Sequence, residues 1–347
     1  MAPIRIGLMG LGRIGRNLFR ILYQSDDIEI AVIDDIADHR SLEYLIRFDT
    51  MLGPFPEELS IKEGHLYVAG RQIPMTSTED PAESRWADHG VDIVIEAAGR
   101  ERTREELEQH LANGAKRVIL CAPPKDPPDL TVVIGVNDGE LRPDHRIVSN
   151  ASCTAHCAAP IVKILDDAFG IERAFLSTVH AYSNQQRLAD VPAEDPRRGR
   201  AAAENIIPQE TNAAAVVAEL LPEMAGKISA KAINVPVRNG SVVDLVCWHS
   251  KPVTETAINE VVRTAISSNW QEIMRYEDDP IVSNDIIRSA YSGTFDSLAT
   301  MVLGDKVSKT LSWFDNGWGY AHRVVDLIRK LGAFDGAGSP GSDKEVA

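Results

Sequence analysis

The sequence has few cysteines, a deficit of basic residues and no long apolar run. Four cysteines in 347 residues are too few for a disulfide framework, so we expect free thiols and a cytoplasmic protein. No stretch approaches the roughly 18 apolar residues of a membrane span, and residues 1–16 lack the basic and apolar regions of a signal peptide. Basic side chains number 36 against 51 acidic ones, and the net charge of −15 disfavours binding to nucleic acid or to an anionic membrane.

Hydrophobic residues make up 44% of the chain, which is enough for one large or two medium domains. In the first part, short apolar runs alternate with helical patterns, which predicts an α/β domain with a Rossmann-type, doubly wound parallel sheet. The expected elements are strands at 4–9, 28–33, 92–96, 117–121 and 131–135 and a helix at 102–113, closed by Gly114.

After about Asn150 the apolar runs lengthen, which predicts an α+β domain with a mixed or antiparallel sheet. Its expected elements are strands at 174–182, 231–237 and 241–250, helices at 153–169, 201–221 and 254–269, and a long loop at 181–200. We therefore expect a first domain over residues 1–151, completed by a C-terminal helix at 317–331, a second, catalytic domain over 152–316, and a flexible tail over 332–347.

A glycine-rich turn separates the first strand from the helix that follows it: Gly10-Leu11-Gly12-Arg13-Ile14-Gly15. In this context the first glycine allows the tight turn, the second lets the backbone approach a pyrophosphate, and the third allows helix and strand to pack closely. Asp35 follows Gly15 by about twenty residues, where a carboxylate accepts hydrogen bonds from ribose hydroxyls and repels a 2′-phosphate. The pattern predicts an NAD site. The alternative is a turn without a ligand, with Asp34 and Asp35 as solvated loop acids.

A second motif opens the second part of the chain: Ser149-Asn150-Ala151-Ser152-Cys153-Thr154-Ala155-His156-Cys157. Because an apolar helical pattern follows, Cys153 is expected in the first helical turn, where the backbone dipole can lower the pKa of a thiol. His180, at the end of an expected strand, is the candidate partner that would make the thiolate a nucleophile. Taken singly, a cysteine is more often an inert buried residue, and a histidine a packed core group.

This nonapeptide resembles the SNASCTTNC motif of the phosphorylating glyceraldehyde-3-phosphate dehydrogenases. Further segments resemble motifs of the same family in order and spacing: residues 10–16 (GLGRIGR), 178–184 (TVHAYSN), 197–208 (RRGRAAAENIIP) and 313–320 (WFDNGWGY). The landmarks span residues 4 to about 331, so the resemblance covers nearly the whole chain. It implies the two-domain fold, a homotetramer, and NAD as cofactor.

The resemblance also implies oxidation of an aldehyde with inorganic phosphate as co-substrate. Cys153 would attack the aldehyde, His180 would take the hydroxyl proton as hydride leaves, and phosphate would cleave the resulting thioester to an acyl phosphate. By position, the resemblance assigns NAD contacts to Gly10, Gly12, Arg13, Ile14, Asp35 and Asn316, and substrate or phosphate contacts to Ser152, Thr154, Ser183, Arg198, Thr211, Asn212 and Asn234. No metal site is expected.

The sequence departs from the family at the site for the substrate's own phosphate. Where the family has threonine, aspartate and arginine, this chain has Ser183, Gln185 and Asn234. Loss of the arginine is expected to weaken phosphate capture by roughly ten- to a hundredfold, because a charge-assisted hydrogen bond is lost. Two interpretations stay open: either Arg238 replaces the missing cation, or the pocket suits an aldehyde with a neutral or differently placed polar end.

Two other departures lie near the nucleophile and near the nicotinamide anchor. His156 replaces an asparagine about one turn after Cys153 and is either close to the thiolate or packed against a neighbour. Gly317 replaces a glutamate beside Asn316. A metal site formed by Cys153, His156 and Cys157 is discounted, because three ligands in one short helical segment do not make the closed four-ligand arrangement of structural zinc.

The leading hypothesis is an NAD-dependent phosphorylating aldehyde dehydrogenase that acts on glyceraldehyde 3-phosphate or a relative such as erythrose 4-phosphate. One alternative is a dehydrogenase for a different aldehyde, including an unphosphorylated one. Another is a non-catalytic NAD-binding protein that senses oxidants through Cys153 or serves as a scaffold. The joint presence of Cys153, His180 and Asn316 argues against the last, since such a protein needs no nucleophile, base and nicotinamide anchor together.

Overall fold

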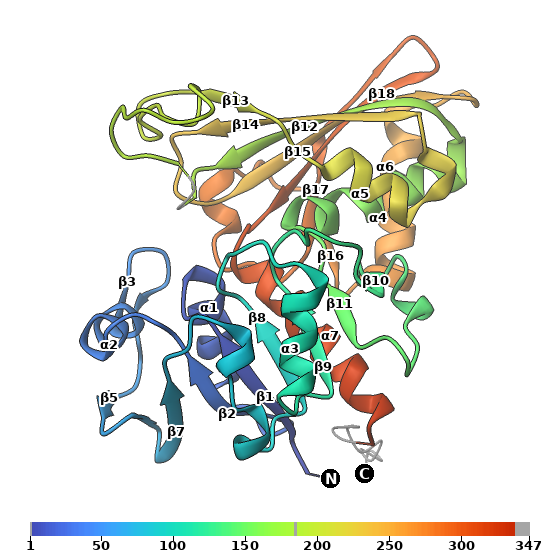
Figure 1. The fold of residues 1–347 in the computed structure, drawn as a ribbon. Coiled ribbons are helices and arrows are strands. Elements are labelled where there is room, and N and C mark those ends of the chain that lie inside the picture. Colours follow the sequence, from blue (N-terminus) through green and yellow to red (C-terminus); the bar gives the residue numbers. More distant parts are fainter. Residues whose placement is uncertain (1, 184–185, 337–347) are drawn as a thin grey trace, which may run out of the picture. The chain divides into compact units, whose positions relative to one another are not determined.

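The computed structural model describes residues 2–183 and 186–336, which form two compact units (Figure 1). The first unit contains the described residues up to Val132, residues Gly139–Asn150, and the described residues from Ala321 onward. The second contains Val133–Asp138 and the described residues of Ala151–Tyr320. Of the tail expected over 332–347, residues 337–347 lie outside the described part of the chain.

The first unit is built on a nine-stranded sheet in the order β10-β11-β9-β8-β1-β2-β7-β6-β5. Its strands are β1 (Ile4–Met9), β2 (Ile28–Asp34), β5 (Leu59–Lys62), β6 (His65–Val68), β7 (Arg71–Thr76), β8 (Ile93–Glu96), β9 (Arg117–Leu120), β10 (Leu130–Thr131) and β11 (Ile147–Ser149). From β10 to β7 every neighbouring pair is parallel, which confirms the predicted doubly wound α/β fold.

Three features of the first unit differ from the sequence prediction. Strands β5, β6 and β7 add an antiparallel edge that the sequence analysis missed. A short hairpin, β3 (Phe48–Asp49) with β4 (Gly53–Pro54), lies outside the large sheet. The strand expected at 131–135 is shorter, since β10 ends at Thr131 and the apolar Val133 belongs to the core of the second unit.

Four α-helices accompany the described part of the first unit: α1 (Arg13–Leu22), α2 (His39–Arg47), α3 (Arg104–Ala112) and the C-terminal portion of α7 (Trp318–Phe334) (Figure 1). The start of α3 is fixed by a capping box, in which Thr103 and Glu106 each accept a backbone N–H of the other. None of the helices in the described residues combines the length and the apolar character that a membrane crossing requires.

The end of α7 packs against the first strand of the chain. A Cβ on Gly332 would lie 2.3 Å from the Ile4 side chain, so any larger residue there would force that side chain to shift. Just beyond, the Arg117 guanidinium donates to both carboxylate oxygens of Asp335, at 3.0 and 3.2 Å. These contacts explain why α7 continues to Phe334 instead of ending at residue 331, where the tail was expected to begin.

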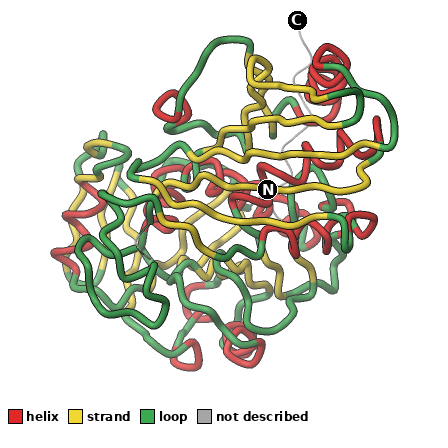
Figure 2. The backbone as a smooth tube through the Cα atoms, turned by 90° about the horizontal axis from the view of Figure 1, so that it is seen from above, coloured by secondary structure: helices red, strands yellow, loops and turns green. Residues whose placement is uncertain are grey.

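The second unit contains a seven-stranded sheet in the order β13-β14-β12-β15-β18-β17-β16, with long strands side by side (Figure 2). Its strands are β12 (Ile171–Ala181), β13 (Ile207–Gln209), β14 (Ile228–Val235), β15 (Ser241–His249), β16 (Met274–Glu277), β17 (Gly293–Leu303) and β18 (Val307–Phe314). The pairs β12–β14 and β16–β17 are parallel and the others antiparallel, so the predicted mixed sheet is confirmed.

Among the described residues, the α-helices that lie wholly in this unit are α4 (Cys153–Phe169), α5 (Ala213–Leu220) and α6 (Glu255–Ala265). The predicted helix at 153–169 is confirmed at both ends. The helix predicted at 201–221 is wrong in its first half, because only α5 is helical and β13 occupies Ile207–Gln209. Pro208 lies in β13, where an edge strand tolerates a residue without an N–H that would interrupt a helix.

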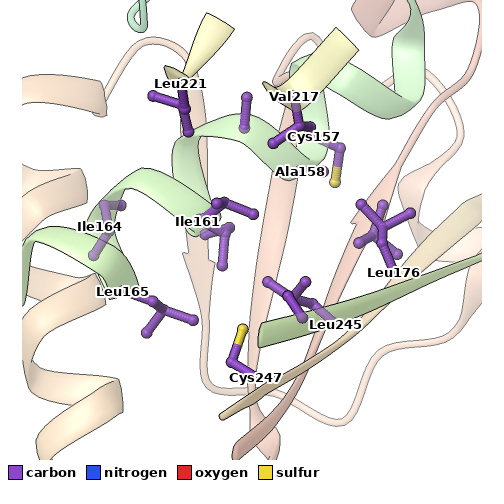
Figure 3. Close-up of a cluster of buried hydrophobic side chains, with 14 of the residues drawn as sticks. Cys157, Ala158, Ile161, Ile164, Leu165, Leu176, Val217, Leu221, Leu245 and Cys247 are labelled. Atoms are coloured by element: carbon purple, nitrogen blue, oxygen red, sulfur yellow. The ribbon is translucent and has the colours of Figure 1, made fainter. Parts of the chain in front are cut away.

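The core of the second unit lies between α4 and the sheet (Figure 3). The buried side chains drawn there come from α4, α5 and its end, and strands β12 and β15: Cys157, Ala158, Ile161, Ile164, Leu165, Val217, Leu221, Leu176, Leu245 and Cys247. Each buried leucine or isoleucine contributes about 1.5–3 kcal/mol of transfer free energy. This packing fixes α4 on the sheet and therefore fixes the position of the helix start at Cys153.

Candidate active site

Cys153 is the first residue of α4. The hydroxyl of Ser152 caps the helix by accepting the backbone N–H of Ala155 at 3.2 Å. The cysteine therefore lies at a helix N-terminus, where the backbone N–H groups point outward and the helix dipole favours a negative charge. Two residues earlier, Ala151 has a φ of 47°, in the left-handed region that costs a residue with a Cβ roughly 1–2 kcal/mol. Strain of this kind concentrates at functional sites.

His180 lies near the end of β12 and faces the cysteine. Its Nε2 is 3.7 Å from the Sγ of Cys153. Its Nδ1 donates to the backbone carbonyl oxygen of Ala181 at 2.6 Å, which leaves Nε2 as the nitrogen that can exchange a proton with the thiol. The ring also packs edge-on against Phe314, with centroids 5.9 Å apart. The structure thus brings the predicted nucleophile and base together on a rigid helix and a rigid strand.

Unlike Cys153, the two other cysteines of the second unit, Cys157 and Cys247, are fully buried in its core. Cys157, about one turn after Cys153, points into the core and donates through Sγ to the carbonyl oxygen of Ser312 at 3.6 Å (Figure 3). Burial, together with the nearby Cys153, raises the pKa of the Cys157 thiol far above its usual range. Burial also raises the pKa of Cys247 to about 12. Both therefore remain protonated thiols near neutral pH.

His156 is a packed residue in this structure. It is only 1% exposed, and its ring meets Tyr320 edge-on at 6.1 Å between centroids. Tyr320 belongs to the first turn of α7, next to the segment that contains Gly317. Of the two interpretations drawn from the sequence, packing against a neighbour is the one that the contact supports.

Asn234 lies beside His180 in the sheet. The two are register partners in the parallel pair β12–β14, so their side chains leave the sheet on the same face. Asn234 is 3% exposed, and its Oδ1 accepts a hydrogen bond from the Nε2 of Gln209 in β13. Ser183 follows β12, and its backbone N–H and hydroxyl donate to Gln186 at 2.7 and 3.1 Å. Gln185 lies outside the described residues.

The residues predicted to contact inorganic phosphate are distributed over three segments. Thr154 is buried in the first turn of α4, next to Ser152. Thr211 and Asn212 immediately precede α5, and the hydroxyl of Thr211 accepts the backbone N–H of Ala213 at 3.2 Å. Arg198 lies on the loop between β12 and β13 and forms an exposed ion pair with Asp195 at 3.7 Å.

The glycine turn of the first unit has the geometry that the motif predicts. Gly10 has a φ of 93°, and a Cβ there would lie 2.5 Å from the backbone of Ala98. A Cβ on Gly15 would lie 2.0 Å from the carbonyl oxygen of Gly10. A Cβ on Gly12 would meet nothing within 4 Å, and no side chain caps α1. The space over Gly12 and the open N-terminus of α1 thus fit a phosphate group.

Asp35 is tied to this turn. One carboxylate oxygen accepts the backbone N–H of Leu11 at 2.6 Å, and the other accepts the N–H of Ala37 at 2.8 Å. A cleft of about 210 Å³ lies over the turn, lined in part by Gly10, Gly12 and Asp35. Arg13 and Ile14, at the start of α1, are half-buried. The carboxylate oxygens keep lone pairs for ribose hydroxyls, so these residues fit the adenosine side of NAD.

Asn316 precedes α7, and hydrogen bonds to the backbone at and beside this residue fix its position. The carboxylate of Asp315 accepts the backbone N–H groups of Gly317 and Trp318 at 2.8 and 2.7 Å. The backbone N–H of Asn316 donates to the side-chain oxygen of Asn239 at 3.3 Å. The Asn316 side-chain Oδ1 is buried and has no hydrogen-bond partner among the described residues. An unsatisfied amide oxygen of this kind fits the carboxamide of nicotinamide.

Comparison with known proteins identifies the family of the chain. Residues 4–104 match the family described as glyceraldehyde 3-phosphate dehydrogenase, NAD binding domain, and residues 152–316 match its C-terminal domain. The chain is 44% identical over 325 residues to glyceraldehyde-3-phosphate dehydrogenase of Geobacillus stearothermophilus, covering 93% of this chain and 97% of that protein. It is 46% identical over 332 residues to the Streptomyces coelicolor enzyme of the same name, covering 95% and 98%. The chain belongs to the glyceraldehyde-3-phosphate dehydrogenase family.

Membership in the glyceraldehyde-3-phosphate dehydrogenase family confirms several predictions from the sequence. The family resemblance, the α/β fold with a second mixed sheet, and NAD as cofactor are confirmed. The chain is therefore an oxidoreductase of a family of NAD-dependent, phosphorylating aldehyde dehydrogenases. The roles of individual side chains remain predictions, which the geometry above supports.

Sequence reasoning missed two residues of this glyceraldehyde-3-phosphate dehydrogenase family site. Gln209, the partner of Asn234, was placed in a helix, and only its position after Pro208 could have indicated a strand. The second is Asp315. Two of its four N–H donors, Gly317 and Trp318, follow it directly, but the donors at Asn239 and Arg288 are distant in sequence, and no fixed spacing indicates that they converge.

Proposed function

We propose that this chain oxidises an aldehyde to an acyl phosphate, with Cys153 as nucleophile and His180 as general base and acid. The observation that carries the proposal is the 3.7 Å approach of Cys153 Sγ to His180 Nε2, with the other ring nitrogen bound to Ala181. A thiolate at a helix N-terminus beside an imidazolium is an activated nucleophile. A buried structural cysteine needs neither feature.

The proposed reaction has three steps at Cys153 and His180: addition of the thiolate, loss of hydride, and attack by phosphate. The Cys153 thiolate forms a C–S bond to the aldehyde carbon, while the carbonyl oxygen takes a proton from His180 and becomes a hydroxyl. His180 then removes that proton as the C–H hydride leaves, which converts the thiohemiacetal to a thioester. The backbone N–H of Cys153, at the start of α4, can donate to the oxyanion. A phosphate oxygen finally bonds to the acyl carbon as the C–S bond breaks, which frees the acyl phosphate, regenerates the thiolate and releases the phosphate proton to solvent.

NAD supplies the hydride acceptor when it is bound. On this proposal Gly10, Gly12, Arg13, Ile14 and Asp35 hold its phosphate and ribose groups, and Asn316 Oδ1 accepts from its carboxamide. Support comes from the open space at Gly12 and from the buried, unsatisfied oxygen of Asn316. Ser152, Thr154, Arg198, Thr211 and Asn212 are assigned to inorganic phosphate and Ser183 to the substrate. Support for these assignments is their position at the starts of α4 and α5 and on the neighbouring loops.

Two candidates exist for the aldehyde. The first is a phosphorylated sugar aldehyde, either glyceraldehyde 3-phosphate, after which the relatives are named, or the chemically similar erythrose 4-phosphate. A different aldehyde is favoured by one observation: beside His180 lies the buried amide of Asn234, bound to a second amide, Gln209. We further infer a homotetramer in the cytoplasm. The tetramer is what the motif resemblance to the family implies, and the four free cysteines fit a reducing compartment.

The test is NADH formation, followed by absorbance, from purified protein, NAD and D-glyceraldehyde 3-phosphate or D-glyceraldehyde, with and without inorganic phosphate. We expect phosphate-dependent turnover that is abolished by Cys153→Ser and reduced about 10²- to 10⁴-fold by His180→Asn. Absence of NADH with every aldehyde tried, while NAD still binds and Cys153 is still alkylated, would contradict the proposal and favour a non-catalytic sensor or scaffold.

A further inference from the structure

Gln209 and Asn234 form a buried pair of amides next to the reacting centre. The Nε2 of Gln209 donates to the Oδ1 of Asn234, and Asn234 is the register partner of His180 on the adjacent strand. We propose that this amide pair binds the tail of the aldehyde, that is, its carbons beyond the aldehyde group, and selects an uncharged, hydroxyl-bearing tail over a phosphorylated one. The proposal rests on the proposed function, because it concerns the substrate of the same Cys153 and His180 pair.

The pair lies on the same face of the sheet as the base. In β13 and β14, Ile207 opposes Asn234 and Gln209 opposes Ala232, so the two amides project from the face that also carries His180. Neighbouring strands are about 4.8 Å apart. A substrate carbon bonded to Cys153 and held against His180 therefore has its next carbons within reach of Asn234.

The hydrogen-bonding groups that the two amides do not use between themselves can bind a hydroxyl. Asn234 uses its oxygen for Gln209 and keeps two N–H donors, whereas Gln209 uses one N–H and keeps its carbonyl oxygen as an acceptor. A hydroxyl can accept from Asn234 and donate to Gln209 at the same time. A phosphate dianion has only acceptors, so it would leave the Gln209 oxygen facing negative charge.

The charges near the pair also disfavour a phosphate. Lys231 is three residues before Asn234 in β14, hence on the opposite face of the strand, and it is paired with Glu210. Arg238 follows the strand and is exposed. Asn234 itself is only 3% exposed, so a phosphate held there would lose water without gaining a lysine or arginine partner from β14.

The experiment compares three aldehydes: D-glyceraldehyde, D-glyceraldehyde 3-phosphate, and propanal, which lacks the tail hydroxyls. We expect the parent enzyme to have a higher kcat/KM for D-glyceraldehyde than for either of the others. Asn234→Arg should shift the ratio of phosphorylated to unphosphorylated glyceraldehyde upward by about ten- to a hundredfold, because it supplies a charge-assisted bond. Asn269→Arg, which adds the same charge at an exposed position of the second unit, should leave the ratio unchanged.

A second variant tests the proposal in case the protein with Asn234→Arg does not fold. Gln209→Ala should lower the preference for D-glyceraldehyde over propanal about tenfold, with the KM for NAD unchanged. A parent enzyme that strongly prefers the phosphorylated aldehyde, or a Gln209→Ala preference equal to that of the parent, overturns the assignment while leaving the proposed reaction intact. No NADH from any of the three aldehydes overturns the proposed function and this inference with it.

Discussion

The side-chain amide of Asn239 donates to the carboxylate of Asp315 at 2.7 Å. The same carboxylate accepts three backbone N–H groups, those of Arg288, Gly317 and Trp318, at 2.7–2.9 Å. Asp315 is only 2% exposed, so these four donors replace the water that an exposed carboxylate would have. One side chain thus links the end of β18 to the loop at Arg288 and to the start of α7. It thereby fixes the backbone conformation of the adjacent Asn316.

We predict that Asp315→Asn lowers the free energy of unfolding by about 2–4 kcal/mol, because an amide nitrogen would face N–H donors and leave some of them unsatisfied. It should also raise the KM for NAD, since the backbone that carries Asn316 loses its support. Chemical denaturation and steady-state kinetics measure the two effects. Asp305→Asn, at an exposed position, is the control, and equal stability of the two variants would contradict the prediction.

We predict that iodoacetamide modifies Cys153 in the folded protein and spares Cys157 and Cys247. Burial raises the pKa of both spared thiols, whereas Cys153 lies at a helix N-terminus beside His180. Peptide mass spectrometry after brief alkylation at pH 7 identifies the modified residue. His180→Asn should slow the reaction at Cys153 at least tenfold, because the imidazolium that stabilises the thiolate is gone. Cys157 labelled as fast as Cys153 would refute the assignment.

We predict a loss of stability on mild acidification that depends on His249. Burial lowers the pKa of His249, although its hydrogen bond to the Gly170 carbonyl oxygen and the nearby Asp166 act in the opposite direction. The neutral ring accepts the Ser308 hydroxyl at 2.7 Å. Below about pH 6.5 His249 binds a proton in the unfolded chain, whereas in the folded protein it binds one only at lower pH. The contribution of His249 is therefore fully present above that pH and is lost as the pH falls.

Urea unfolding at a series of pH values measures this effect. The slope contributed by one histidine is at most about 1.4 kcal/mol per pH unit. His249→Gln should flatten the curve by up to that amount between pH 6.5 and the folded-state pKa, whereas His65→Gln, on the antiparallel edge of the first unit, should not. An unchanged curve for His249→Gln would show that the buried ring is protonated without cost.

We predict that Asp35→Ser weakens NAD binding by roughly tenfold and narrows the gap between NAD and NADP. The change removes an acceptor for ribose hydroxyls, a repulsive charge against a 2′-phosphate, and the 2.6 Å bond to the Leu11 N–H that supports the turn. Equilibrium titration with each dinucleotide measures both constants. Asp26→Ser, an exposed acid after α1, serves as control. An unaltered ratio of the two constants would mean that Asp35 does not select the cofactor.

Local sequence patterns predicted the elements that carry the site. The alternation around Gly10–Gly15 requires a strand, a turn and a helix, and the run after Cys153 has a clear helical period, so both were located correctly. Patterns failed where tertiary pairing decides the structure. Residues 201–212 are rich in alanine and favour a helix, yet pairing with β14 makes Ile207–Gln209 a strand.

The partners of the site residues were harder to predict than the residues themselves. Asn234 could be identified from its position, but its bond to Gln209 depends on the register of two strands that are distant in sequence. The same holds for Asp315, whose donors at Asn239 and Arg288 reach it only after the sheet has formed. Neither relationship has a fixed spacing that could be found along the chain.

The close fit of Gly332 in α7 against Ile4 in β1 has a consequence for synthesis on the ribosome. The first unit needs residues from both ends of the chain, whereas the second is drawn from the middle. Domains fold as units while the chain emerges. The second unit can therefore fold before α7 has been synthesised, and until then the Ile4 side chain lacks the helix that covers it.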